Sequence, residues 1–366
     1  MNKIRFTKLL PFVLTAIVSL GLVASFATQS RAEIAIGILT DLSGKASLLG
    51  KQIELGVRLA GQSTADKELR LEVQDSACDP RQAQKAAVKL LRLNVSVVVG
   101  PICSKAMYAA IKVLSPAGIT VISPSIRASR IAHGRKKKNW RVYTLAGDAK
   151  SEADAIAKLL LERWQGKAYA IADDGSIYGR GLADQFRTLA ELSGQKPVAL
   201  ANYRPLQSNQ ISMLRRLAKS GLEALFVGGE AVDIAQIARD VEKLGLDIEI
   251  AGGESLSLLP YEDNALSVPQ GVLAVMPVEP ARYQAAAGLV SKLKRQNIDS
   301  EGGIIPGYAL MQIAVAATKS GKTNIDGQEF DTILGPLSFS ENGYASAYPY
   351  QLHVWRDGQI KPLGGF

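Results

Sequence analysis

The stretch VSVVVGPICS, residues 95–104, decides the fold class of this chain. Four of its first five residues are valine, which is typical of a strand buried on both faces of a sheet. Gly100 and Pro101 end that strand, and a helical pattern then runs from Ser104 to Leu114. A buried strand followed closely by a helix predicts one unit of a parallel α/β sheet.

The same alternation of strand and helix continues on both sides of this stretch, over a chain of 366 residues. Further strands are predicted at residues 34–39, 69–73, 120–122, 168–172, 198–203, 224–227 and 248–251. These are too many strands for one compact sheet, and the length suits two domains of ~100–200 residues each. The sequence therefore predicts an α/β fold with two Rossmann-like three-layer lobes and parallel-rich sheets.

The first 32 residues have the organisation of a secretory signal peptide. Lys3, Arg5 and Lys8 precede a largely apolar stretch over residues 9–27, and small residues stand at positions −3 and −1 of a site that ends at Ala32. The alternative is a retained membrane anchor, but polar residues interrupt the apolar stretch. We expect cleavage after Ala32 and a mature protein that is exported.

Composition and charge exclude several classes of protein. The chain is 47% apolar and 21% charged, which is ordinary for a globular protein. Removing the four positive charges of the first 32 residues from the net charge of +9 leaves +5, which is no argument for nucleic-acid binding. The one dense basic run, residues 135–138, lacks interleaved aromatic residues and is predicted to be a solvated loop tip. A contact with anionic lipid or an acidic partner is the alternative for this run.

Residues suited to catalysis or metal binding are scarce. A hydrolytic triad would have to use His133 or His353, neither of which stands in a recognisable motif. The two cysteines, Cys78 and Cys103, would pair in an oxidising compartment, and the alternative is two buried thiols. With so few soft ligands a zinc site is not expected. We therefore expect neither an enzyme nor a cofactor.

Polar side chains follow four of the predicted strands. Ser104 and Ser125 follow two strands of the first lobe, while Tyr178 and Glu254 follow two strands of the second lobe. Open α/β sheets bind ligands outside the carboxyl ends of their strands. Ser104 at a helix N-terminus suits a carboxylate, and Glu254 suits a cation. This combination fits a zwitterionic amino acid, although each residue alone could equally be a helix cap, a core residue or a surface residue.

Six segments in order carry a resemblance to a known family. They are residues 75–80 (DSACDP), 99–104 (VGPICS), 118–124 (GITVISP), 178–181 (YGRG), 306–309 (PGYA) and 334–337 (LGPL). The chain resembles the periplasmic leucine/isoleucine/valine-binding proteins of ABC importers. The resemblance implies a type I periplasmic-binding fold with two lobes joined by a three-strand hinge, and a Cys78–Cys103 disulfide. It also implies a solute-binding protein that presents an amino acid or a related carboxylate to a membrane permease.

The resemblance also implies lobe boundaries and residue roles. Residues 33–146 and 277–341 would form the first lobe, and residues 147–276 and 342–366 the second. Ser104 matches the serine that holds the ligand carboxylate, Tyr178 matches a pocket tyrosine, and Glu254 matches the acid that receives the ligand ammonium.

Several positions depart from the pattern of that family. After Ser125, Ile126 and Arg127 stand where a small residue and a threonine are common. Glu230 and Leu49 stand where aromatic residues are common. We include all of these as candidate ligand-binding residues and expect a specificity that differs from Leu, Ile or Val. The expected partners are a small-molecule ligand and a permease, with the chain itself a monomer; a ligand sensor of the same fold, acting in signalling, is the alternative.

Overall fold

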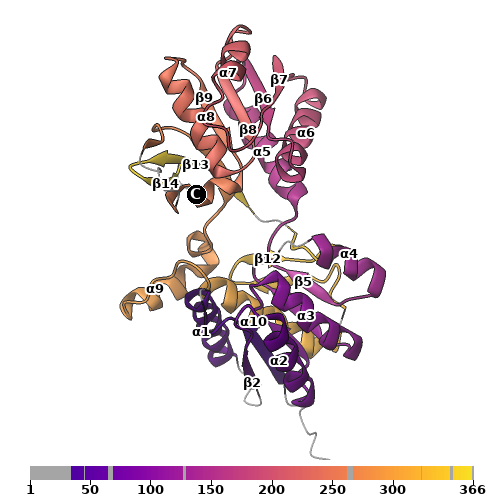
Figure 1. Ribbon diagram of the computed structural model, residues 1–366. Coiled ribbons are helices and arrows are strands. Elements are labelled where there is room, and N and C mark those ends of the chain that lie inside the picture. The colour runs from indigo at the N-terminus through magenta and orange to yellow at the C-terminus, as the bar shows by residue number, and fades with distance from the viewer. Residues whose placement is uncertain are drawn as a thin grey trace, which may run out of the picture. The chain divides into compact units, whose positions relative to one another are not determined.

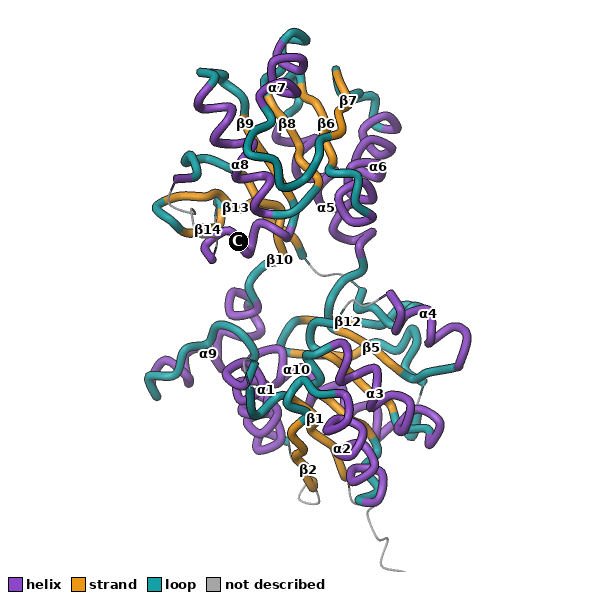
Figure 2. Tube along the Cα trace, viewed as in Figure 1, coloured by secondary structure: helices purple, strands orange, loops and turns teal. Residues whose placement is uncertain are grey.

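Two parallel-rich sheets, each with helices on both faces, make up the computed structural model of this chain (Figure 1, Figure 2). The structure describes residues 34–44, 46–64, 69–126, 129–261, 267–322, 324–346 and 349–364. The predicted signal peptide and its cleavage site lie outside these residues, and so does Arg127. Every helix within the described ranges is too short or too polar to span a bilayer.

The first sheet has five parallel strands in the order β2-β1-β3-β4-β5. Their bounds are β1 Ile34–Thr40, β2 Leu69–Asp75, β3 Val97–Val99, β4 Thr120–Ser123 and β5 Val142–Thr144. As the valine run predicts, β3 is buried throughout. Helices α1 (Ser47–Ser63) and α10 (Ile304–Ser320) cover one face, whereas α2 (Pro80–Arg92) and α3 (Ser104–Leu114) cover the other. The predicted three layers are therefore confirmed for this lobe.

The second sheet has seven strands in the order β14-β13-β10-β9-β8-β6-β7. Its strands are β6 Tyr169–Asp173, β7 Ala199–Asn202, β8 Ala224–Gly228, β9 Glu249–Gly252, β10 Leu273–Pro277, β13 Tyr350–Arg356 and β14 Gln359–Pro362. The pairs β7–β6, β6–β8, β8–β9 and β9–β10 are parallel. β13 pairs with β10, and β14 with β13, to form an antiparallel edge. Its helices are α5 Ala149–Arg163 and α6 Ile177–Leu192 on one face, and α7 Ile211–Ala218, α8 Ala231–Lys243 and the 3₁₀ helix η2 Glu254–Tyr261 on the other.

The chain passes between the two sheets three times, after β5, after β10 and before β13, as the family fold implies. Between the last two passages it returns to the first sheet and forms α9 (Ala287–Arg295), α10 and the hairpin of β11 (Phe330–Thr332) and β12 (Gly335–Leu337). Bridges join Tyr344 to Thr144 and Ala345 to Phe339, so these residues lie with the first sheet. The division into lobes at particular residues stays a prediction.

The prediction of a solvated loop tip at residues 135–138 is wrong. These residues form the last turn of α4 (Ser129–Lys138), where positive charges interact favourably with the helix dipole. Arg135 is only 8% exposed: its Nε donates to the carbonyl of Glu341 at 2.8 Å, and its guanidinium pairs with Asp326. The group also lies 4.3 Å from the centre of the Tyr143 ring. Arg135 therefore ties α4 to the C-terminal part of the first lobe, while the three lysines after it are exposed.

Glu249 at the start of β9 joins that strand to the end of α5. Its carboxylate accepts hydrogen bonds from Arg163 Nη2 at 2.5 Å and from the indole nitrogen of the buried Trp164 at 2.6 Å. Burial opposes ionisation of Glu249, but these hydrogen bonds and the nearby positive charges outweigh it and hold its pKa below the ordinary value of 4.5. Glu249 therefore contributes stability above about pH 4.5 that is lost as pH falls through the lower pKa of the folded protein.

Replacing Glu249→Gln is expected to lower the free energy of unfolding at pH 7 by about 1–2 kcal/mol, because it removes the charge that Arg163 and Trp164 bind. Urea unfolding of both proteins at pH 7 and near pH 3 measures this difference. The difference should be smaller at the acidic pH, because the stabilisation by Glu249 begins to be lost below the ordinary pKa of 4.5. An equal difference at both pH values would contradict the assignment.

Candidate functional site

The carboxyl ends of β3 and β4 place Ser104 and Ser125 on one edge of the first sheet. Ser104 is the first residue of α3 and is exposed, so the free N–H groups of the helix start lie beside its hydroxyl. The loop after β4 is held by Ser123, whose hydroxyl donates to the carbonyl of Pro101 at 2.8 Å and accepts from the N–H of Ile126 at 2.9 Å. This edge offers hydrogen-bond donors and the positive end of a helix dipole, which suit an anion.

The other two candidates of the first lobe differ in exposure. Ile126 is 7% exposed and belongs to the hydrophobic core that α2 and α3 form against the sheet. Its side chain is therefore a core residue, and the prediction that it contacts ligand is not supported. Leu49 is 38% exposed in the first turn of α1, beside Leu48, which is 73% exposed. The start of α1 thus presents apolar side chains to solvent at the carboxyl end of β1.

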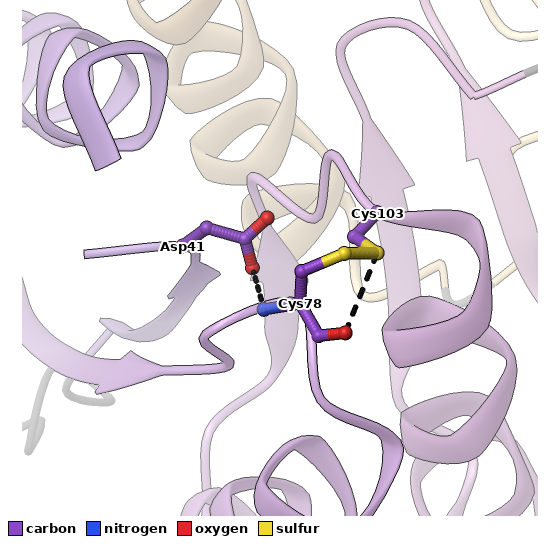
Figure 3. Close-up of side chains that lie close together, drawn as sticks. All are labelled: Asp41, Cys78 and Cys103. Carbon is purple, nitrogen blue, oxygen red and sulfur yellow. Dashed lines mark hydrogen bonds between the residues drawn. A yellow bond between two sulfur atoms is a disulfide. The ribbon is translucent and has the colours of Figure 1, made fainter. Parts of the chain in front are cut away.

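The disulfide between Cys78 and Cys103 is present and lies directly before Ser104 (Figure 3). Asp41, which is fully buried, accepts hydrogen bonds at Oδ1 from the N–H of Cys78 at 2.7 Å and from the hydroxyl of Ser76. These contacts join the loops that follow β1, β2 and β3. Asp41 and the two sulfurs are the one cluster with metal-ligand spacing in the described ranges, but sulfurs bonded to each other cannot serve as thiolate ligands.

In the second lobe, Tyr178 and Glu254 meet at a residue that the sequence analysis did not select. Glu152, in the first turn of α5, is 1% exposed. Its Oε1 accepts hydrogen bonds from the Tyr178 hydroxyl at 2.7 Å and from the N–H of Glu254 at 2.8 Å. A Cβ on Gly253 would lie 2.4 Å from the same oxygen, so any other residue there would force the carboxylate of Glu152 to move. The structure therefore brings the two predicted residues together.

Tyr350, the first residue of β13, completes this cluster. Its hydroxyl donates to Oε1 of Glu254 at 2.5 Å. Burial, together with the carboxylates of Glu152 and Glu254, raises the pKa of Tyr178 well above its ordinary value. Tyr178 therefore stays protonated at physiological pH and remains a hydrogen-bond donor. The sequence marks neither Glu152 nor Tyr350, since each lies within an ordinary helix or strand pattern.

Local capping explains why Tyr178 lies on a helix. The hydroxyl of Ser176 accepts the N–H of Gly179 at 2.9 Å and caps α6, which therefore begins at Ile177. Tyr178 then lies in the first turn of the helix, where its hydroxyl reaches Glu152. Gly179 in turn packs closely against Gly228 at the end of β8. A Cβ on Gly228 would lie only 2.4 Å from the carbonyl oxygen of Gly179, so this approach needs a glycine.

Glu230 follows β8 and occupies the N-cap position of α8 without a capping hydrogen bond from its side chain. It is exposed, at the same carboxyl edge of the second sheet as Tyr178 and Glu254. The second sheet therefore gathers acidic and phenolic groups at this edge, whereas the first sheet gathers donors at its own. The acidic and phenolic side chains of the second sheet suit a cation, whereas the donors of the first sheet suit an anion.

Comparisons with known proteins match most of the length of this chain. A family model described as periplasmic binding protein matches residues 33–348. The Leu/Ile/Val-binding protein homolog 3 of Brucella melitensis is 26% identical over 355 residues, which cover 92% of this chain and 95% of that protein. A substrate-binding protein of Desulfitobacterium hafniense in complex with Leu has 20% identity and a TM-score of 0.66, over 91% of this chain and 100% of that one. A solute-binding protein of R. palustris in complex with 4-hydroxybenzoate has 15% identity and a TM-score of 0.61, over 90% and 95%.

Proposed function

Because the chain belongs to the periplasmic binding protein family, we propose that it is the solute-binding component of an ABC importer whose ligand is an amino acid or a related carboxylate. Members of this family bind solutes and are not enzymes, in agreement with the scarcity of catalytic residues in the sequence. The observation that carries the amino-acid assignment is the convergence of Tyr178 and Glu254 on the buried Glu152. A surface that carries two carboxylates and a phenol favours a ligand with an ammonium.

The relatives span two ligand classes, and the second-lobe edge favours one of them. The ligands named for the two solved structures, Leu and 4-hydroxybenzoate, both carry a carboxylate, but only Leu carries an ammonium. The donors near Ser104 would serve either carboxylate. The carboxylate of Glu254 could accept a neutral hydrogen bond from the hydroxyl of 4-hydroxybenzoate, but it would bind the charged ammonium of an amino acid more strongly. We therefore place this chain with the amino-acid binders and retain Ser125, Arg127, Glu230 and Leu49 as proposed determinants of its side-chain specificity.

Binding of such a ligand between the two lobes would shift them toward a closed form, which the permease then recognises. This role requires export, for which the first 32 residues supply the proposed signal. A sensor of the same fold would use the same closure to contact a signalling partner. Loss of ligand uptake on deletion of the gene distinguishes the importer from the sensor.

Calorimetric titration of the mature protein with amino acids, their amides and aromatic acids tests the proposed ligand class. We expect an α-amino acid to bind most tightly, and its deaminated analogue, which keeps the carboxylate and side chain, to bind at least tenfold more weakly. Small-angle scattering at saturating ligand should show a smaller radius of gyration. An aromatic acid without an ammonium as the tightest ligand would overturn the proposal.

A further inference from the structure

Glu254, the proposed acceptor of the ligand ammonium, is held at two points by residues distant in sequence. Its main-chain N–H donates to Glu152, 102 positions earlier, and its carboxylate accepts from Tyr350, 96 positions later. The first contact fixes where η2 begins, and the second fixes where the carboxylate points. Neither Glu152 nor Tyr350 is among the residues that the sequence suggests for ligand contact.

Glu152 is suited to hold a fixed geometry. It lies in the first turn of α5, whose start is capped by Asp148 through the N–H of Ser151 at 2.8 Å. One oxygen of this buried carboxylate accepts both the Tyr178 hydroxyl and the Glu254 N–H. Gly253 packs directly on that oxygen. A shift of Glu152 would therefore move Tyr178 and Glu254 together.

Tyr350 is fixed by the sheet itself. It pairs with Pro277 in the antiparallel ladder of β13 and β10, and its ring packs on the hydrophobic core below α5 and α6. The N–H of Val278, next to Pro277, donates to the carbonyl of Pro349 at 2.9 Å. The hydroxyl is therefore presented by a ring with little freedom, at 2.5 Å from Glu254 Oε1. A carboxylate can accept about four hydrogen bonds, so a ligand ammonium can bind while Tyr350 keeps its contact.

We propose that Glu152 and Tyr350 are positioning residues that set the preference of the site for ligands with an ammonium group. They do so by holding Glu254 in one orientation before the ligand arrives, which removes the entropic cost of ordering its side chain on binding. This inference rests on the proposed function. Its consequence is specific: loss of either residue weakens the binding of an amino acid but leaves its deaminated analogue, which has no group for Glu254 to bind, nearly unaffected.

The variant Tyr350→Phe tests this by removing one hydroxyl and keeping the ring. We expect the dissociation constant of the best amino acid to rise about tenfold, while that of the deaminated analogue changes less than about twofold. Tyr169→Phe is the matched control, since Tyr169 donates its hydroxyl to the carbonyl of Gln195 in the same lobe. This control should leave the ratio of the two constants unchanged, and thermal unfolding should report that each variant is folded.

A second pair of variants tests Glu152. Glu152→Gln keeps an acceptor oxygen and should retain most of the ammonium preference, whereas Glu152→Ala should lose it. If Tyr350→Phe leaves the ratio of the two dissociation constants unchanged, whether or not both ligands bind more weakly, the inference is overturned while the proposed function stands. A parent protein that binds no amino acid would overturn both. In a Glu254→Gln background, Tyr350→Phe should cause little further loss of amino-acid affinity, because the two act through one contact.

Discussion

The double variant Cys78→Ser/Cys103→Ser is expected to be less stable to unfolding than the parent by about 3–4 kcal/mol. The disulfide closes a loop of 25 residues, and the entropy that this closure removes from the unfolded chain sets the magnitude in the chain-entropy model. The contacts of Asp41 with the N–H of Cys78 and with Ser76 do not involve sulfur, so both should persist in the variant. Urea unfolding at neutral pH measures the change.

A reductant provides the control for this result. It should destabilise the parent by a similar amount and leave the double variant unchanged. Thiol titration of the unfolded, unreduced parent should detect no free thiol. Two thiols per chain would show that the bond does not form in the protein as purified.

The variant Glu254→Ala is expected to weaken the binding of the best amino acid by about 2–5 kcal/mol, because the ligand ammonium would then be buried without its acceptor. Ser104→Ala should cost less, about 1–3 kcal/mol, since in the proposed binding mode the N–H groups at the start of α3 would still bind the ligand carboxylate. Calorimetry on the folded variants measures both losses.

Glu162→Ala is a suitable control for Glu254→Ala, because Glu162 is an exposed acid on α5 of the same lobe. It should bind ligand as the parent does. If Glu254→Ala retained parental affinity while the protein bound an amino acid, the ammonium would be held elsewhere and the proposed role of Glu254 would be wrong.

The fold was predictable because its signals are local. A run such as VSVVV followed by a glycine, a proline and an amphipathic helix predicts a buried parallel strand without reference to the rest of the chain. Repetition of that unit predicts two sheets, and polar residues after the strands predict the edges where a ligand binds. The cysteine pair could be proposed because few alternatives exist for two cysteines in an exported protein.

Local patterns failed where a residue far along the chain determined the outcome. Four consecutive basic residues suggest a solvated loop, but Arg135 is buried by residues such as Asp326 and Glu341, about 200 positions later. Ile126 was a candidate because the resemblance places its loop at the ligand, and the structure shows its side chain in the core with α2 and α3. In both cases burial depends on what packs against the residue, and the sequence around it carries no such information.

By itself, the sequence determined most of the alternation of strands and helices, the two sheets and the edge of each at which polar groups gather, but it did not reveal α4 or β5. These features follow from hydrophobic periodicity and turn residues, which act over a few positions. Only the tertiary structure showed that Tyr178 and Glu254 share one oxygen of Glu152 and that Tyr350 holds the carboxylate of Glu254. These hydrogen bonds join residues that are 26, 102 and 96 positions apart, and they exist only once the sheets have formed, so no local pattern could reveal them.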